Sequence, residues 1–240
     1  MVDASALGAQ VTAYFRANGA RYGLRAERTE ARYVLNWGGF VNYSFTVTDG
    51  TRAYHLKLAG DEVHATRLRR WQALHRLLEE RYRAPELVDW VALPGSSMQG
   101  ALFRHVGGAP PDFERTPELL PAVLALCGRL HGDGDLRAAL AGLGPPAPMS
   151  LADAFCATYI ARFDEDLAAV AAERPPFVTD AVLSWMERET RRLERSVREA
   201  AAFAGPAVSP VHGDLQANNL LLTGSGEWYV LDWDDLDLGD

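Results

Sequence analysis

The N-terminal part of the chain changes from a helical to a strand-like pattern of hydrophobic residues. Apolar side chains recur at helical spacing over residues 4–18, and Gly19 is expected to cap that helix. Three segments rich in β-branched and aromatic residues predict strands: 32–36, 40–47 and 53–59. A Thr48-Asp49-Gly50 turn closes a hairpin between the last two. The pattern therefore predicts three consecutive antiparallel strands after an opening helix.

A longer amphipathic segment follows these strands. Residues 61–81 carry Leu68, Trp71 and Leu74 on one helical face, which predicts a helix packed on the sheet. Two further strands are expected at residues 86–91 and 101–105. Residues 1–105 are therefore predicted to form a lobe of antiparallel sheet and helix.

The pattern changes again after a Gly/Pro-rich linker at residues 106–111. Helix-capping residues then begin three helical stretches: Thr116 to about His131, Ser150 onward with aromatic residues every fourth position, and Thr179 to about Phe203. Residues 106–240 are therefore predicted to form a mainly helical lobe. The fold class expected is α+β with two lobes.

Charge and composition exclude several classes of partner. The 24 Lys and Arg residues against 32 Asp and Glu give a net charge of −8, which disfavours nucleic acid and anionic lipid as partners. The sequence has no run approaching the roughly 18 apolar residues of a membrane span, and its start lacks the layout of a signal peptide. Cys127 and Cys156 lie in helical patterns, as expected of reduced thiols. We expect a cytoplasmic protein with no membrane partner.

The chain contains a single lysine, Lys57, while every other basic residue is an arginine. A lysine kept in such a background can mark a position that needs a compact ammonium group. Chance retention is the alternative interpretation of this residue.

Candidate chemistry is concentrated near the C-terminal end of the sequence. Asp214 precedes Asn219 by five positions, an apolar run follows, and a second apolar run over residues 228–231 leads into Asp232. A hairpin centred between residues 225 and 226 would place Asn219 opposite Asp232. Their oxygens are the hard ligands that Mg²⁺ takes, and Asp214 would then accept a proton from a substrate hydroxyl. The pattern indicates phosphoryl transfer, with an Asx-rich surface loop as the alternative.

A second copy of the same tripeptide provides an internal control. His131-Gly132-Asp133 repeats His212-Gly213-Asp214, but Ala138 stands where the later segment has Asn219. No apolar run ending in Asp follows it at hairpin distance. The earlier copy is therefore predicted to be a helix end and a turn.

The later segment resembles the catalytic loop and metal-binding hairpin of the aminoglycoside phosphotransferase family, relatives of choline kinases with a protein-kinase-like fold. The resemblance extends over about 200 residues in the same order. Residues 35–45 are similar to the family's glycine-containing first hairpin, residues 103–108 to its hinge, and residues 126–131 to its helix that ends in Leu-His.

The resemblance implies roles for individual residues in a Mg²⁺-dependent site for ATP or GTP. Asp214 would be the catalytic base, supported by His212, while Asn219 and Asp232 would hold Mg²⁺. The residues implied in nucleotide binding are Lys57, Gly38, Gly39 and Asn42. Asp234 would either approach the metal or be a solvated turn residue.

The sequence departs from the family pattern in three places. The first is that residues 37–40 do not form a protein-kinase glycine signature. The helix after Lys57 should supply a glutamate to pair with it, and Glu62 is the candidate. The family also continues beyond a similar Gly-Asp, so the chain is expected to be truncated after Asp240.

The function expected is transfer of the γ-phosphoryl group of ATP or GTP to a hydroxyl of a small molecule such as an aminoglycoside, an amino alcohol or a sugar. The acidic composition favours a cationic acceptor. A catalytically silent, nucleotide-binding regulatory relative is the alternative. A protein kinase is disfavoured because no Ala-Pro-Glu motif follows Asp232. The sequence makes no prediction of oligomeric state.

Overall fold

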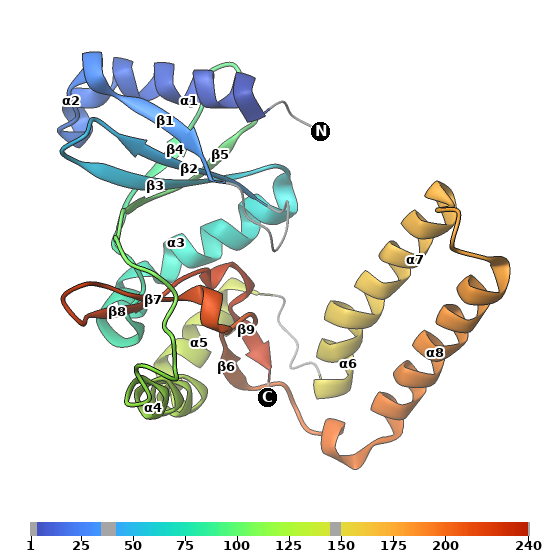
Figure 1. The fold of residues 1–240 in the computed structure, drawn as a ribbon. Helices are drawn as coiled ribbons and strands as arrows, with labels where there is room; N and C mark the ends of the chain where they lie inside the picture. The colour runs from blue at the N-terminus through green and yellow to red at the C-terminus, as the bar shows by residue number, and fades with distance from the viewer. Residues whose placement is uncertain (1–3, 35–41, 145–149, 240) are drawn as a thin grey trace. The chain divides into compact units, whose positions relative to one another are not determined.

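A computed structural model of the chain describes residues 4–34, 42–144 and 150–239 (Figure 1). Gly38 and Gly39, predicted to bind nucleotide, lie outside the described residues. The chain divides into two compact units, which are described separately. The first, here the sheet unit, comprises Met1–Gly128 and His212–Leu236, and the second, the helical unit, comprises Arg129–Val211 and Asp237–Asp240. The division into lobes at residues 105 and 106 stays a prediction.

The sheet unit is built on a five-stranded antiparallel sheet. The strand order is β1-β2-β3-β5-β4. The strands are β1 (Glu30–Tyr33), β2 (Asn42–Thr48), β3 (Ala53–Ala59), β4 (Leu87–Ala92) and β5 (Gln99–Arg104). The prediction of three consecutive antiparallel strands is confirmed. In this register Ser44 of β2 and Ala101 of β5 flank Lys57 at the centre of the sheet.

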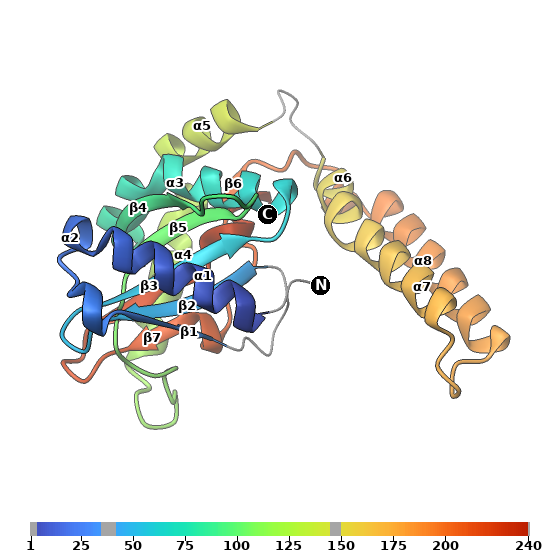
Figure 2. The ribbon, with the colours of Figure 1, turned by 90° about the horizontal axis from the view of Figure 1, so that it is seen from above.

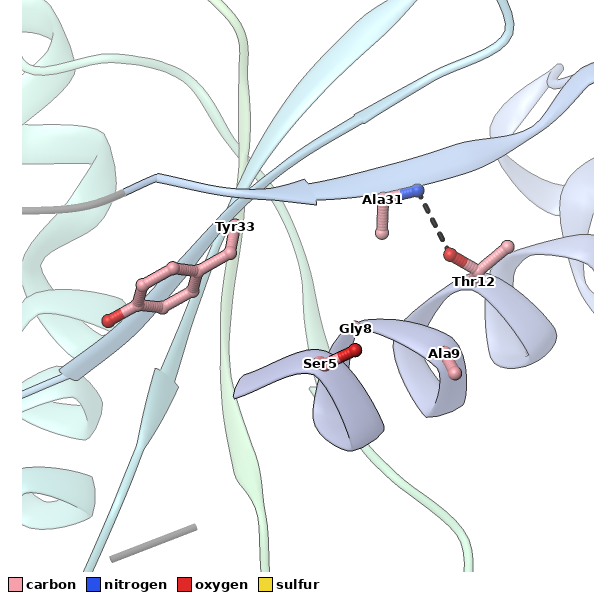
Figure 3. A pocket seen from close by; sticks show the side chains of 6 residues that line it. All are labelled: Ser5, Gly8, Ala9, Thr12, Ala31 and Tyr33. Carbon is pink, nitrogen blue, oxygen red and sulfur yellow. Dashed lines mark hydrogen bonds between the residues drawn. The ribbon is translucent and has the colours of Figure 1, made fainter. Parts of the chain in front are cut away.

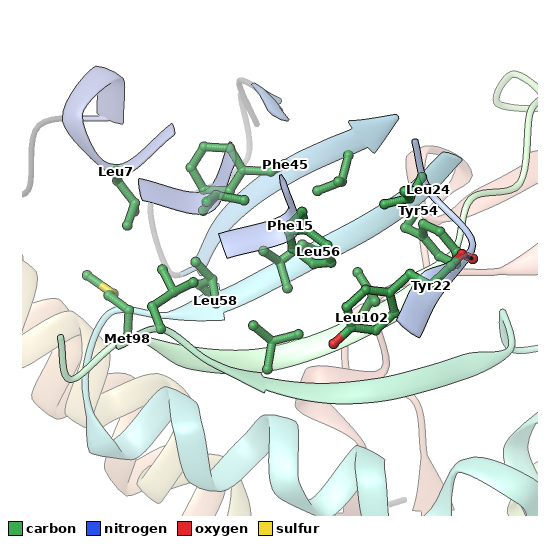
Figure 4. Close-up of a cluster of buried hydrophobic side chains, with 14 residues drawn as sticks. Leu7, Phe15, Tyr22, Leu24, Phe45, Tyr54, Leu56, Leu58, Met98 and Leu102 are labelled. Carbon is green, nitrogen blue, oxygen red and sulfur yellow. Dashed lines mark hydrogen bonds between the residues drawn. The ribbon is translucent and has the colours of Figure 1, made fainter. Parts of the chain in front are cut away.

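Helix α1 (Ala4–Ala17) lies over one face of the sheet (Figure 2). An apolar core lies on that face (Figure 4). Phe15 of α1 is fully buried with Phe45 of β2 and Leu56 of β3. The prediction that Gly19 caps α1 is wrong. Gly19 begins the short helix α2 (Gly19–Tyr22), and Gly23, with φ +65°, ends it in the left-handed conformation that glycine adopts readily.

The opposite face of the sheet packs on α3 (Glu62–Tyr82), which runs below the sheet in Figure 1. Leu68 and Trp71 are buried on this helix, and the Trp71 ring lies 4.3 Å from that of Phe103 on β5. The Asp61 side chain caps the helix by accepting from the His64 amide, and Arg83 ends it at φ +58°. The helix predicted from hydrophobic periodicity is confirmed.

A short hairpin of β7 (Leu220–Leu222) and β8 (Trp228–Val230) corrects a predicted register. Asn219 stands opposite Leu231 and not opposite Asp232. The Leu231 amide donates to the Asn219 carbonyl oxygen. The reason is the loop, in which the Thr223 amide donates to the Glu227 carbonyl oxygen. The three residues between them end in Gly226, which has φ +85°. A three-residue loop with a left-handed glycine shifts the pairing by one position relative to a two-residue turn.

The helical unit contains α5 (Gly134–Leu143), α6 (Leu151–Phe155), a π-helical turn (Cys156–Ile160), α7 (Ala161–Glu173) and α8 (Asp180–Glu199). The predicted caps Ser150 and Thr179 are confirmed, since their side chains accept from the amides of Asp153 and Val182. The prediction that α8 continues to Phe203 is wrong, because the helix ends at Glu199. The strands β6 (Ser209–Val211) and β9 (Asp237–Gly239) pair antiparallel in the same unit.

Two further helix predictions need correction. The helix predicted from Thr116 is α4 (Leu119–Gly132), because the Leu119 amide bonds to Thr116 O in a tight turn before the helix begins. The uninterrupted helix predicted after Ser150 is broken by the π-helical turn. Its wider winding changes the helical phase, and Tyr159 and Phe163 are exposed rather than aligned on a buried face.

Candidate active site

Lys57 lies on the face of β3 opposite the apolar core, and its ammonium group is enclosed by carboxylates. The side chain is 9% exposed. Its Nζ donates to Asp234 Oδ2 at 2.7 Å and also to Asp232 Oδ1. The Trp71 ring of α3 lies 5.8 Å from Nζ, within the range of a cation–π contact. A buried ammonium requires such compensation, because an unpaired buried charge is strongly destabilising.

Asp234 connects Lys57 to the start of β2. Its Oδ2 also accepts from Asn42 Nδ2 at 2.6 Å. Asp234 is buried, so it is not the solvated turn residue that one interpretation of the sequence allowed. Within the described residues, Asp234 Oδ1 and Asn42 Oδ1 are buried without a hydrogen-bond donor. These two acceptor oxygens leave part of the hydrogen-bonding capacity of the site unused.

Burial and charge shift the titration of this cluster in different directions. Burial by itself would lower the pKa of Lys57, but Asp234 and Asp232 outweigh it and hold that pKa above its usual range. Burial raises the pKa of Asp234, and the negative charge of Asp232 adds to the effect. For Asp232, the Lys57 charge outweighs burial and keeps the pKa of the carboxyl below its usual range. Lys57 and Asp232 are therefore an ion pair at neutral pH.

The backbone between β8 and the cluster is held in an unusual conformation. Asp232 adopts φ +62° and ψ +57°, a left-handed geometry that costs a residue other than glycine about 1–2 kcal/mol. The next residue, Trp233, is fully buried and donates through Nε1 to Val230 O at 2.9 Å. This packing stabilises the turn that directs Asp232 and Asp234 to Lys57.

The loop that carries Asp214 is attached to the same turn through His212. The His212 Nε2 atom lies 2.8 Å from Leu231 O, so Nε2 carries the proton and donates to that carbonyl. Nδ1 is then the acceptor for the Asp214 amide, at 3.3 Å. Burial lowers the pKa of His212, and the ring lies 4.6 Å from that of Trp233. His212 is therefore a neutral ring that links the loop to the residue preceding Asp232.

Asp214 itself is exposed and accepts hydrogen bonds from its own loop. Asn219 Nδ2 donates to Asp214 Oδ2 at 2.9 Å and to the Asp214 carbonyl at 2.8 Å. Gln216 Nε2 donates to the same carboxylate at 3.3 Å. Sequence reasoning missed Gln216, for which the only signal was its position inside the Asp214–Asn219 loop. The two amides orient a carboxylate that solvent can still reach.

The predicted site residues thus form two hydrogen-bonded groups in the sheet unit. One group joins Asn42, Lys57, Asp232 and Asp234, and the other joins His212, Asp214, Gln216 and Asn219. Leu231 connects them, since its carbonyl accepts from His212 and its amide donates to Asn219 O. No hydrogen bond recorded for the described residues joins the side chains of Asn219 and Asp232. In the described part of the chain, no group of three or more His, Cys, Asp or Glu side chains forms a ready-made metal site.

The prediction that Glu62 pairs with Lys57 is wrong. Glu62 is an exposed residue in the first turn of α3, and the carboxylates bonded to Lys57 are those of Asp232 and Asp234. The sequence gave one signal for the actual partner, the second aspartate two positions after Asp232.

A separate hollow lies between α1 and β1, as Figure 3 shows. It is lined by small or polar residues: Ser5, Gly8, Ala9, Thr12, Ala31 and Tyr33. The Thr12 hydroxyl accepts from the Ala31 amide at 3.0 Å and so covers an unpaired group of the edge strand. The lining of this hollow carries no charged side chain.

Solved structures of phosphotransferases share this fold. The GDP and kanamycin complex of APH(2″)-IIIa is 17% identical with a TM-score of 0.60, covering 88% of this chain and 69% of that one. Spectinomycin phosphotransferase with ADP and spectinomycin is 12% identical, with a TM-score of 0.54 and coverage of 88% and 65%. Plasmodium vivax ethanolamine kinase is 14% identical, with a TM-score of 0.59 and coverage of 96% and 62%. The predicted α+β, kinase-like fold class is confirmed, and the chain spans about two thirds of the length of these structures.

The family follows from the sequence itself. Residues 32–240 match the phosphotransferase enzyme family, and the chain belongs to that family. The resemblance predicted from the sequence motifs is confirmed. A search of curated proteins by sequence finds no significant match. Over the described residues, none of the helices has the length and apolar character needed to cross a membrane.

Proposed function

We propose that this chain is a small-molecule kinase that transfers the γ-phosphoryl group of ATP or GTP to a hydroxyl group. The observation that carries the proposal is the enclosure of the only lysine by two carboxylates, beside a loop that presents Asp214 to solvent. Phosphoryl transfer proceeds through a loose transition state, for which a protein supplies positioning and charge neutralisation. The clustered charges are suited to that task.

Asp214 is the proposed catalytic base, because it is an exposed carboxylate oriented by hydrogen bonds from Asn219 and Gln216. It would accept the proton of the substrate hydroxyl as the phosphoryl group is transferred. His212 is proposed to hold the loop and not to exchange protons, since its two ring nitrogens are engaged with Leu231 and Asp214.

The donor set fits a magnesium ion, which prefers oxygen ligands. Asp232 supplies a carboxylate that is 28% exposed, the Asn219 amide supplies a second oxygen, and Asp234 Oδ1 is a buried acceptor without a donor among the described residues. We propose that Asn219 and Asp232 hold the ion. When bound, Mg²⁺ would neutralise charge on the nucleotide phosphates.

Lys57 is the proposed ligand of the nucleotide phosphates, and Asn42, Gly38 and Gly39 belong to the same proposed set. Two of the similar structures are complexes with GDP and ADP, so either purine base is compatible with the proposal. The three structures are a kanamycin complex, a spectinomycin complex and an ethanolamine kinase. For this chain we propose a hydroxyl-bearing aminoglycoside, amino alcohol or sugar, with the net charge of −8 favouring a cationic acceptor.

A nucleotide-binding regulatory relative is the second candidate. It is favoured by α3, whose buried side chains are apolar or aromatic, so that the helix presents no carboxylate to Lys57 in the described structure. Nucleotide binding without phosphoryl transfer would distinguish this candidate from the enzyme.

Calorimetric titration with ATP and GTP, each with and without Mg²⁺, tests the proposed function. We expect Mg²⁺-dependent binding that falls at least about tenfold in Lys57→Ala and in Asp232→Asn. Lys57→Arg is the matched variant, which keeps the positive charge but replaces the compact ammonium with a planar guanidinium. Binding that is absent, or indifferent to Mg²⁺ and to all three substitutions, would contradict the proposal.

A screen of hydroxyl compounds for nucleotide-dependent phosphorylation separates the two candidates. The enzyme should form phosphorylated product, and Asp214→Asn should strongly slow product formation while nucleotide binding persists. Binding without product for every acceptor class would favour the regulatory relative.

A further inference from the structure

The helix beside Lys57 does not supply its counter-ion. The buried side chains of α3 are Ala65, Leu68, Trp71, Leu74, Leu78 and Tyr82. Its glutamates are engaged or exposed elsewhere: Glu62 lies in the exposed first turn, and Glu79 Oε1 accepts from the Leu87 amide at 2.7 Å. The sheet-facing side of α3 offers Lys57 an aromatic ring and no carboxylate.

Helix α3 also contacts the segment after β8, and in these contacts the helix supplies positive charge instead of a carboxylate. Here the helix supplies cations: Arg67 pairs with Asp235, and Arg70 Nη1 donates to Leu236 O at 3.0 Å. The segment that contacts α3 through these arginines is also the one that sends Asp234 to Lys57. The acidic groups of this region therefore come from the segment, and the basic groups come from α3 and β3.

The two carboxylates bonded to Lys57 differ in their access to solvent. The Asp234 side chain is 8% exposed, whereas that of Asp232 is 28% exposed. Asp234 is also held by Asn42 Nδ2 at 2.6 Å, on the strand next to β3. Asp232 is therefore the more accessible of the two carboxylates, while Asp234 is enclosed with Lys57 on one side and Asn42 on the other.

We propose that Asp234 is the positioning residue of Lys57, replacing a helix glutamate, and that Asn42 orients the Asp234 carboxylate. The consequence for nucleotide binding rests on the proposed function. With Asp232 bound to a cation, Lys57 would still have Asp234 as a buried counter-ion. The Lys57–Asp234 pair is thus the permanent part of the cluster, and the Lys57–Asp232 pair is the exchangeable part.

Nuclear magnetic resonance on protein labelled with ¹⁵N-lysine tests the pairing directly. Because Lys57 is the only lysine, the spectrum contains a single side-chain ammonium signal. We expect Asp234→Asn to shift this signal and to speed exchange of its protons with water, since the buried charge-assisted hydrogen bond is lost. Asp235→Asn is the matched control, because it removes the neighbouring carboxylate that pairs with Arg67. A signal that responds equally to both substitutions, or to neither, overturns the proposal.

Titration of Mg²⁺-ADP and Mg²⁺-GDP provides the second measurement. Asp234→Asn should lower the affinity for the nucleotide that the wild type binds by about tenfold, and Asp234→Glu should recover part of that loss. The affinity of Asp235→Asn should stay within about twofold of the wild type. Asn42→Ala keeps the carboxylate but removes its donor, and we expect an intermediate loss of about threefold. Wild-type affinity in Asp234→Asn contradicts the proposal.

The two measurements separate the failure of this inference from the failure of the proposed function. If the wild type binds neither nucleotide, the proposed function fails, while the lysine signal still reports whether Asp234 holds Lys57. If Asp234→Asn does not fold, Asn42→Ala and Asp234→Glu are compared with Asp235→Asn by the same signal, and a response confined to the first two supports the proposal. No difference among the three overturns it.

Discussion

The tripeptide His-Gly-Asp occurs twice in the chain and has two unrelated structures. In the first copy, His131 and Gly132 end α4, and the Asp133 side chain caps α5 by accepting from the amides of Asp135 and Leu136. In the second copy, the buried His212 ring accepts from the Asp214 amide, and the Asp214 carboxylate is presented to solvent. The prediction that the first copy is a helix end and a turn is confirmed.

The glycines show why the two copies differ. Apart from its chain neighbours and its own helix backbone, no atom of the described residues lies within 4 Å of the position a Cβ would take at Gly132. At Gly213, φ is +84° and a Cβ would lie 2.3 Å from the Asp235 carbonyl oxygen. The second copy therefore depends on a close approach to a distant part of the chain, whereas the first needs only local helix geometry. Identical residues acquire different roles because their surroundings differ.

The largest contrast is expected for the two aspartates. Asp214→Asn should lower the rate of phosphoryl transfer by about 10² to 10⁴, because the base that accepts the hydroxyl proton is removed. Asp133→Asn should leave the rate within about twofold, since asparagine also serves as an N-cap. Steady-state kinetics with an accepted substrate measures both, and equal effects would remove the functional distinction between the copies.

The second largest contrast is expected between substitutions of the two glycines, Gly213 and Gly132. Gly213→Ala should reduce the free energy of unfolding by about 3 kcal/mol or more, because it combines a left-handed backbone with a clash against backbone atoms. Gly132→Ala should be neutral or stabilising by up to about 1 kcal/mol, because alanine favours the helix. Urea unfolding of the two variants measures the difference, and a tolerated Gly213→Ala would show that the loop can move away from Asp235.

The burial of His212 predicts that the stability of the fold depends on pH. Because burial lowers the pKa of His212, the unfolded chain binds a proton there below about pH 6.5 that the folded chain resists. Stability from this residue is therefore lost as the pH falls through that value, at up to about 1.4 kcal/mol per pH unit. Urea unfolding from pH 7.5 to 5 should show a smaller loss in His212→Gln than in the wild type. Parallel curves would contradict a neutral buried ring.

The smallest effect concerns the cap in the first copy. Asp133→Ala should lower the free energy of unfolding by about 1 kcal/mol, since two amides at the start of α5 lose their acceptor. Asp133→Ser should recover most of that loss. Thermal unfolding monitored by circular dichroism compares the two variants with the wild type, and an equal loss in both would argue against the cap.

Much of the local structure could be predicted from the sequence because it depends on neighbouring residues. Asp61 before α3, Ser150 before α6 and Thr179 before α8 each accept from the backbone amide three residues later. The π-helical turn at Cys156–Ile160 could not be predicted, since nothing in the spacing of Phe155, Tyr159 and Phe163 distinguishes it from a regular helix.

The candidate site was predictable in its residue types but not in its pairings. The single lysine and the Asp214, Asn219 and Asp232 spacing identified the segments. The pairing of Asn219 with Leu231 follows from the left-handed Gly226, which selects a three-residue loop. That choice depends on a backbone conformation, which a residue count alone cannot specify.

The sequence by itself determined the order of the elements, the family, and which residues carry charge. Only the tertiary structure decided that Asp234, and not Glu62, lies against Lys57. Asp234 and Lys57 are far apart along the chain. They come into contact because the left-handed turn at Asp232 and the buried Trp233 direct the segment toward β3. Local propensities act over a few residues, whereas an ion pair between distant segments depends on the packing of everything that joins them.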